Sequence, residues 1–250
     1  MRKATKVRIA VLLAAAVAIE IACRAGIIKP YSMIPPTQML VSLVKLFTTS
    51  GAVADMKQTL TAVVIALTSA LVVGFVLGAV LHAVPRLRRI VDPLLATYYS
   101  VPIFVFYPVF IVAFGLNAIP KTVIGFLYAL VAVVINTLNG LDRVPAVLVK
   151  TTRIMRLSPV DTALRVTLPA AGPYIVTGIK LAVAYAFIGV IGSEFIMSRG
   201  GIGYEISFAY TSFDNATMYP LIVLILLASV AVNAVLSRWE QRLLARRGMR

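Results

Sequence analysis

The feature that most restricts the fold of this chain is a series of long segments without charged side chains. One of them runs from Lys57 to Arg86, with no lysine, arginine, aspartate or glutamate between these two residues. A stretch of about 20 apolar residues matches the hydrocarbon thickness of a bilayer. A backbone in lipid must satisfy its own hydrogen bonds, which favours helices for such spans. The sequence therefore predicts an all-α, polytopic membrane protein, in agreement with a composition that is 60% hydrophobic and only 13% charged.

We expect six transmembrane helices. Their approximate ranges are 8–28, 58–82, 93–116, 120–141, 173–197 and 218–237. In the second span, Gly74 and Gly78 form a pair of small residues that lets a neighbouring helix approach closely. In the third span, Pro102 and Pro108 predict kinks within one continuous helix.

The spans divide the chain into four parts. They are a first transmembrane helix over 1–30, an outer interfacial segment over 31–56, a five-helix core over 57–237 that contains the loop 142–172, and a basic tail over 238–250. The outer segment is predicted to form an amphipathic helix, because apolar residues recur at helical spacing. These residues are Met39, Leu40, Leu43, Val44 and Phe47.

Basic residues give the chain a formal net charge of +15. With the N-terminus inside, most of them fall in the head, the short loop around Arg88, the loop 142–172 and the tail. Lysine and arginine accumulate on the cytoplasmic side of membrane proteins, so both termini are predicted to be cytoplasmic. Because the charges sit in short loops between spans, we expect no nucleic-acid partner.

The loop 142–172 is predicted to contain two short helices around an exposed turn. The first helix is expected to run to about Arg156. Ser158 is a favourable N-cap for the second helix, with Pro159 at its first position and Asp161 three residues after the cap. Leu168-Pro169 is expected to end this second helix. Such a charged hairpin is either a solvated linker or a docking element for another protein.

The end of this loop, Val166-Thr167-Leu168-Pro169, resembles a motif of bacterial ATP-binding-cassette (ABC) importer permeases. Their inner loop carries E-A-A-x-x-x-G, nine further residues, and then I-x-L-P. In this register, Lys150, Thr151 and Thr152 take the E-A-A positions and Arg156 takes the glycine position. An arginine is expected to adopt ordinary helical dihedrals there, whereas glycine would permit others.

The resemblance extends over about residues 34–240. Over this range the sequence is similar to the nitrate, sulfonate and taurine branch of these permeases. The segments that carry it include "GAVADMKQTL", "INTLNGLDRVP" and "PVDTALRVTLPAAGPYIVTGIKLAVAYAFIGVIGSEFIMSRGGIGYEI". The resemblance implies that the loop is a coupling helix, which inserts into a groove of a separate ATPase. The residues that would make this contact are Lys150, Thr151, Thr152, Arg153, Met155, Arg156, Leu157, Ser158 and Pro169.

The same resemblance implies the partners and the location. The chain would work with ABC ATPase subunits, a periplasmic or lipid-anchored solute-binding protein and a second permease copy, in a homodimer or a heterodimer, as a multi-pass protein of the bacterial inner membrane. The substrate would be a small organic or inorganic anion, with an aromatic acid or a vitamin-precursor heterocycle as the alternative. We expect no cofactor on this chain, since ATP and magnesium would bind the partner ATPase and the sequence lacks G-x-x-x-x-G-K-(S/T).

A stand-alone channel or carrier and a membrane-embedded enzyme are the competing classes. An enzyme needs clustered nucleophiles, histidines or paired acids. With one histidine and nine scattered acids, we expect neither catalysis nor a metal site. His82 is expected to stand without a carboxylate cluster.

Four polar residues within the spans are candidates for the translocation path or its gate. They are Tyr98, Tyr99, Asn136 and Glu194. Hydrogen bonds between helices are the alternative for the first three. For Glu194, the alternative is a structural carboxylate bonded to a neighbouring helix or to the loop at Gly200-Gly201. Lys180, also within a span, is expected to extend its amine toward the inner surface.

Overall fold

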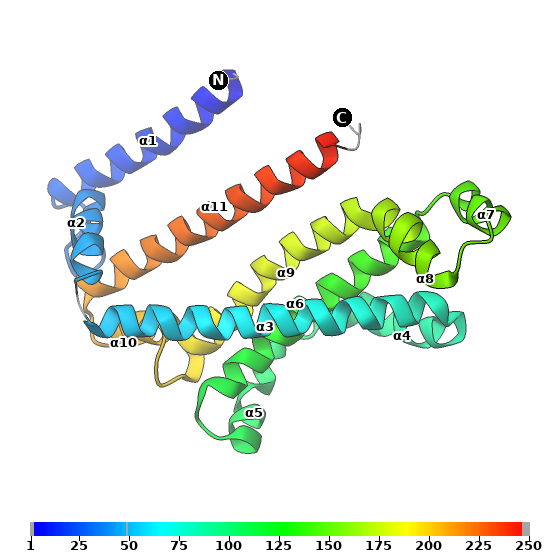
Figure 1. The fold of residues 1–250 in the computed structure, drawn as a ribbon. Coiled ribbons are helices and arrows are strands. Elements are labelled where there is room, and N and C mark those ends of the chain that lie inside the picture. Colours follow the sequence, from blue (N-terminus) through cyan, green and yellow to red (C-terminus); the bar gives the residue numbers. More distant parts are fainter. Residues whose placement is uncertain (1–2, 49, 247–250) are drawn as a thin grey trace. The chain divides into compact units, whose positions relative to one another are not determined.

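The computed structural model describes residues 3–48 and 50–246, and these residues form helices and connecting turns without any strand (Figure 1). The all-α prediction is confirmed. Four segments of the described chain contain helices long and apolar enough to cross a membrane, and a shorter apolar segment covers Ile103–Phe114. The protein is therefore a multi-pass membrane protein. Its long helices are α3 (Ser50–Ala83), α6 (Ala118–Asp142), α9 (Leu168–Met197) and α11 (Asn215–Arg246).

The chain divides into two compact units. The first comprises Met1–Gln58 and Glu194–Ala228, and the second comprises Thr59–Ser193 and Ser229–Arg250. Residues 247–250 of the predicted basic tail lie outside the described part.

In the first unit, the Glu20 carboxylate of helix α1 (Lys3–Arg24) forms hydrogen bonds with the start of α2 (Pro36–Leu46). Glu20 accepts hydrogen bonds from the Thr37 backbone N–H at 3.0 Å and from the Thr37 hydroxyl at 2.7 Å. Glu20 thus caps the start of α2, where backbone donors have no partner within the helix. A helix forms where the amphipathic one was predicted, with Met39 and Leu43 buried and Leu40 and Val44 exposed, and its place at the outer interface stays a prediction.

The second unit has a core of small residues on α3, α6 and α9. A Cβ atom placed on Gly74 would lie 2.8 Å from the Cβ of Val133, and one on Gly78 would lie 2.7 Å from the Cβ of Thr137. Both distances are too short for real side chains, so the α3 backbone at these glycines packs directly against Val133 and Thr137 of α6. The predicted close approach at this pair is confirmed.

The third predicted span is wrong as one kinked helix. The chain instead forms α4 (Pro85–Thr97), two 3-10 turns (Tyr98–Ser100 and Ile103–Phe106) and α5 (Tyr107–Phe114). Val101 is extended, as expected for a residue before proline, and Pro108 lies in the first turn of α5. The two prolines therefore separate and start helices here instead of bending one.

Candidate functional site

The loop between α6 and α9 forms a helical hairpin at the ends of these two helices (Figure 1). Its first arm is α7 (Ala146–Ile154), and its second arm begins with α8 (Pro159–Thr162). We call residues 146–167 the hairpin. The two predicted helices and the turn between them are confirmed.

The turn is closed by backbone hydrogen bonds around Arg156. The Leu157 N–H donates to the Thr152 carbonyl at 3.0 Å, and the Arg156 N–H donates to the Arg153 carbonyl at 3.1 Å. This pair of bonds defines a Schellman motif, which requires a left-handed residue after the helix. Arg156 supplies it with φ +52°. The expectation of ordinary helical dihedrals at Arg156 is wrong, because the two bonds hold the backbone in a conformation usually given to glycine.

The second arm starts with the predicted cap. The Ser158 hydroxyl accepts from the Asp161 N–H at 3.0 Å and donates to the Asp161 carboxylate at 2.7 Å. Arg165 lies one turn further, with its Nε 3.0 Å from Asp161. The one acid of the hairpin is thus occupied by its own neighbours.

Leu168-Pro169 does not end the second arm, contrary to the prediction. A π-helical turn over Ala163–Thr167 leads directly into α9, and the Leu168 N–H donates to the Ala163 carbonyl. A proline cannot donate a backbone hydrogen bond, and a wider π turn before it changes the local bonding pattern without ending the helix. The hairpin is therefore continuous with the long helix α9.

The hairpin presents basic and apolar side chains to its surroundings. Lys150, Arg153 and Arg156 are exposed, as is Ile154, with 82% of its surface accessible, and Met155, with 65%. Among the other predicted contact residues, Thr151, Ser158 and Pro169 are exposed and Leu157 is half-buried. Thr152, by contrast, is buried and cannot contact a partner without rearrangement.

A cluster of polar side chains joins three elements at the base of the hairpin. Arg88 of α4 donates two hydrogen bonds to Asp142, the last residue of α6, at 2.8 and 2.6 Å. His82 of α3 places its Nδ1 3.0 Å from the same carboxylate, which differs from the isolated position expected for it. Asp142 raises the pKa of the Arg88 guanidinium, chiefly by accepting these hydrogen bonds. His82 and Asp142 line a cleft of about 760 Å³, together with Lys150, Arg153 and Thr167.

Glu194 is fully buried in the first unit, at the N-terminus of helix α10 (Ile202–Thr211). Its Oε2 accepts from the Gly203 N–H at 3.1 Å. The Asp55 carboxylate accepts from the Gly201 N–H at 2.7 Å. Carboxylates are favourable beside the unpaired N–H groups at a helix start. The hydrogen bond to Gly203 supports the structural role that the sequence left open for Glu194. A role of Glu194 in the path or its gate stays a prediction.

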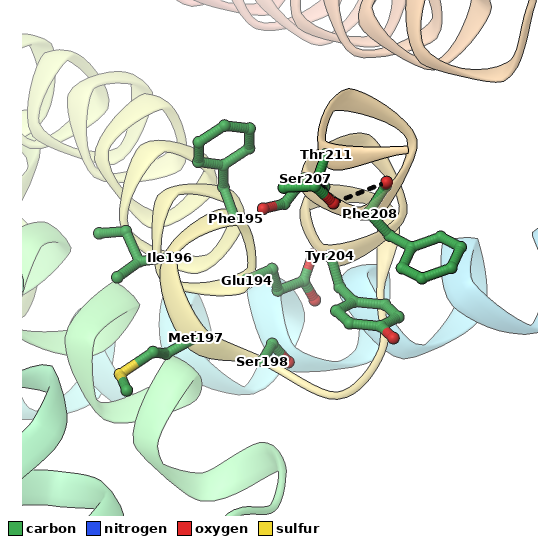
Figure 2. Close-up of a pocket in the computed structure, with 9 residues that line it drawn as sticks. All are labelled: Glu194, Phe195, Ile196, Met197, Ser198, Tyr204, Ser207, Phe208 and Thr211. Carbon is green, nitrogen blue, oxygen red and sulfur yellow. Dashed lines mark hydrogen bonds between the residues drawn. The ribbon is translucent and has the colours of Figure 1, made fainter. Parts of the chain in front are cut away.

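Glu194 also lines a small pocket of about 170 Å³ between the end of α9 and α10 (Figure 2). Four of the residues that line it carry a hydroxyl group, namely Ser198, Tyr204, Ser207 and Thr211. Gly201 lies against the carboxylate, because a Cβ atom there would overlap Glu194 Oε1. A side chain at 201 would therefore displace the carboxylate from the start of α10.

The other path candidates lie in the second unit. The Tyr98 hydroxyl donates to the Leu127 carbonyl of α6 at 2.9 Å. This hydrogen bond between elements is the alternative to a path role that the sequence left open for Tyr98. Asn136 is half-buried and donates to the Ala132 carbonyl of its own helix at 2.8 Å. The side chain of Tyr99 lies outside the part that the structure describes. Neither Tyr98 nor Asn136 lies near Glu194 in the sequence, and the two residues belong to a different unit from it.

Sequence reasoning missed several partners. The sequence does not indicate that Arg88 binds Asp142 or that Asp55 binds Gly201, because these partners are 54 and 146 residues apart in the chain. Lys180 pairs with Glu240 of α11 at 3.4 Å, a partner that the sequence did not indicate. A signal did exist for Asp142, since it is the only acid between Asp92 and Asp161.

Residues 70–248 match the protein family described as "Binding-protein-dependent transport system inner membrane component". The nitrate import permease protein NrtB of Leptolyngbya laminosa is 28% identical over 166 residues, which cover 66% of this chain and 60% of that protein. The match thus spans less than two thirds of that relative's length. The taurine transport system permease protein TauC of Escherichia coli is 27% identical over 229 residues, covering 88% of this chain and 80% of TauC.

The fold is similar to that of a chain in the inward-facing MetNI methionine ABC transporter. The TM-score is 0.64, and the match covers 76% of this chain and 95% of that chain. The sequences are only 20% identical, so this likeness concerns the fold alone.

Proposed function

The chain belongs to the family of binding-protein-dependent transport system inner membrane components, and from this premise we propose that it is the permease subunit of an ABC importer. It provides the translocation path in a bacterial inner membrane, next to a second permease copy. A solute-binding protein delivers the substrate from outside, and separate ATPase subunits supply the energy. The observation that carries this proposal is the hairpin, an exposed helix-turn-helix that continues directly into α9.

The mechanism is alternating access. ATP binding draws the ATPase subunits together, and the docked hairpins move with them. Because the hairpin is joined without a break to α9 and through a short linker to α6, its movement reaches two helices of the second unit. The membrane path opens outward to receive the solute, and hydrolysis restores the inward-open state.

The substrate is a small organic or inorganic anion. This assignment draws on relatives named for nitrate and taurine transport. The expected residues of the path or its gate are Tyr98, Tyr99, Asn136 and Glu194.

The hairpin surface defines the ATPase groove that fits it. Ile154 and Met155 offer apolar contacts, and Lys150, Arg153 and Arg156 surround them with positive charge. Since Asp161 is already engaged by Arg165 and Ser158, the exposed charge of this surface is positive. The groove is therefore expected to have an apolar floor and an acidic rim, and its affinity should fall as salt is added.

Arg156→Glu tests the docking role. We expect about tenfold weaker binding of the cognate ATPase at low salt, because a negative charge at the turn would repel an acidic rim. Binding is measured by pull-down and by solute-stimulated ATP hydrolysis in proteoliposomes. Arg89→Glu is the matched control, since it makes the same charge change at an exposed residue of α4. If Arg156→Glu leaves both binding and stimulated hydrolysis unchanged, the docking role is wrong.

A further inference from the structure

Three helices, α3, α4 and α6, meet at one carboxylate, Asp142. We call Asp142, Arg88 and His82 the clamp. Arg88 binds Asp142 through two nitrogens, and His82 approaches the same carboxylate from α3. A two-nitrogen guanidinium–carboxylate contact fixes both distance and orientation. The clamp thus links α3 and α4 to the end of α6, four residues before the hairpin begins.

Helix α4 depends on this link more than its neighbours do. None of its side chains is buried. Only Arg88, Val91 and Leu95 are half-buried, at a spacing that places them on one face. Val91 and Leu95 pack against Leu81, Val134 and Leu138 of α3 and α6. Arg88 is thus the single charged contact on the packed face of a helix with little apolar burial.

The other end of α4 leads to a path candidate. Tyr98 follows α4 directly, and its hydroxyl bonds to the α6 backbone at Leu127. α4 is therefore tied to α6 twice, by Arg88 near its first turn and by Tyr98 just after its last. A single helix of 13 residues thus connects the Arg88 contact to the Tyr98 segment.

We propose that Asp142 is a positioning residue that makes α4 a second lever of the hairpin. Through the clamp, hairpin movement reaches the Tyr98 segment as well as the helices joined covalently to the hairpin. This role rests on the proposed function as an ATP-driven permease. Asp142 acts through Arg88 and does not touch the solute.

The test measures whether α4 follows the hairpin. Spin labels are placed at Leu94 of α4 and Val147 of α7, both exposed, in a Cys23→Ser background. Electron–electron double resonance on the assembled transporter gives their distance with and without ATP and magnesium. We expect one narrow distribution in both states, because the clamp holds α4 to the base of the hairpin. In Asp142→Asn the distribution should widen without nucleotide and shift with ATP.

Function is read in parallel as solute transported per ATP hydrolysed in proteoliposomes, with taurine and nitrate as the probes. Asp142→Asn and Arg88→Gln should each lower this ratio about tenfold, the change expected from losing a charge-assisted hydrogen bond. The double variant should fall no further than the worse single variant, because both act through one contact. Arg88→Lys keeps the charge and should retain part of the ratio, while Arg89→Gln should match the wild type.

Two results overturn the lever. One is an unchanged, narrow label distance in Asp142→Asn together with an unchanged transport ratio. The other is a wild-type distance that already shifts with ATP. A wild-type chain that binds no ATPase would instead contradict the proposed function, and the clamp would then be judged by the nucleotide-free distances. Equal ATPase pull-down by Asp142→Asn and wild type shows that the hairpin itself is intact.

Discussion

At the scale of single residues, Arg156 and Phe213 hold backbone conformations that usually favour glycine, with φ of +52° and +56°. Each follows a helix, α7 or α10, and each is held by the same two backbone hydrogen bonds of a Schellman motif. A left-handed residue with a side chain costs about 1–2 kcal/mol. The turn at Arg156 is therefore strained, and its side chain places a positive charge at the tip of the hairpin.

Replacing Arg156 with glycine should therefore stabilise the hairpin. We expect a gain of about 1 kcal/mol, seen as slower hydrogen exchange of the α7 amides. Arg153→Gly is the matched control, because Arg153 is exposed within the regular part of α7. It should destabilise the arm by about 0.5–1 kcal/mol. Faster exchange in Arg156→Gly would contradict the strain assigned to this turn.

Gly201 combines a strained backbone with a lack of space. Its φ is +106°, and a Cβ atom there would overlap the Glu194 carboxylate. Gly201→Ala should cost more than about 2 kcal/mol, through strain and displacement of a buried charge together. Gly26→Ala separates the two causes, because Gly26 has φ +73° but open space around it. In thermal unfolding in detergent, Gly201→Ala should show the larger drop in midpoint, and an equal drop would remove the clash from the explanation.

At the scale of elements, the contact of α3 with α6 depends on two glycines one turn apart. Gly78→Ala would place a Cβ 2.7 Å from the Cβ of Thr137 and force the helices apart. Overpacking of this kind costs about 1–3 kcal/mol. Thermal unfolding should show a lower midpoint for Gly78→Ala and a partial recovery in Gly78→Ala/Thr137→Gly. Gly51→Ala, in open space on the same helix, should leave the midpoint unchanged or raise it.

The elements also show which local signals can be read from sequence. Ser158, Pro159 and Asp161 predicted the start of α8, because a cap depends on neighbours within one turn. The prolines at 102, 108 and 169 were harder to interpret. A proline can bend a helix, end it, start it or follow a π turn, and the surrounding packing selects among these outcomes. For this reason the predictions of one kinked third span and of a helix end at Leu168-Pro169 are wrong, although both positions do contain prolines.

At the scale of the whole molecule, hydrophobic length was the decisive signal. It predicted an all-α membrane protein and the approximate positions of α3, α6, α9 and α11, because bilayer thickness acts on every span alike. The clamp could not be predicted in the same way. Asp142 and Arg88 are 54 residues apart, and only the packing of α4 on α6 brings them together. Local signals thus located the hairpin, whereas the contacts that link it to other helices required the fold.

The Schellman motif at Arg156 has a consequence for how such transporters share a membrane. Backbone hydrogen bonds set the shape of the turn, so the side chain at 156 can change its charge while the shape persists. The shape of the turn and the charge at its tip can therefore vary independently. In a cell with several importers of this architecture, we expect the charge at position 156 to help determine which ATPase each permease binds.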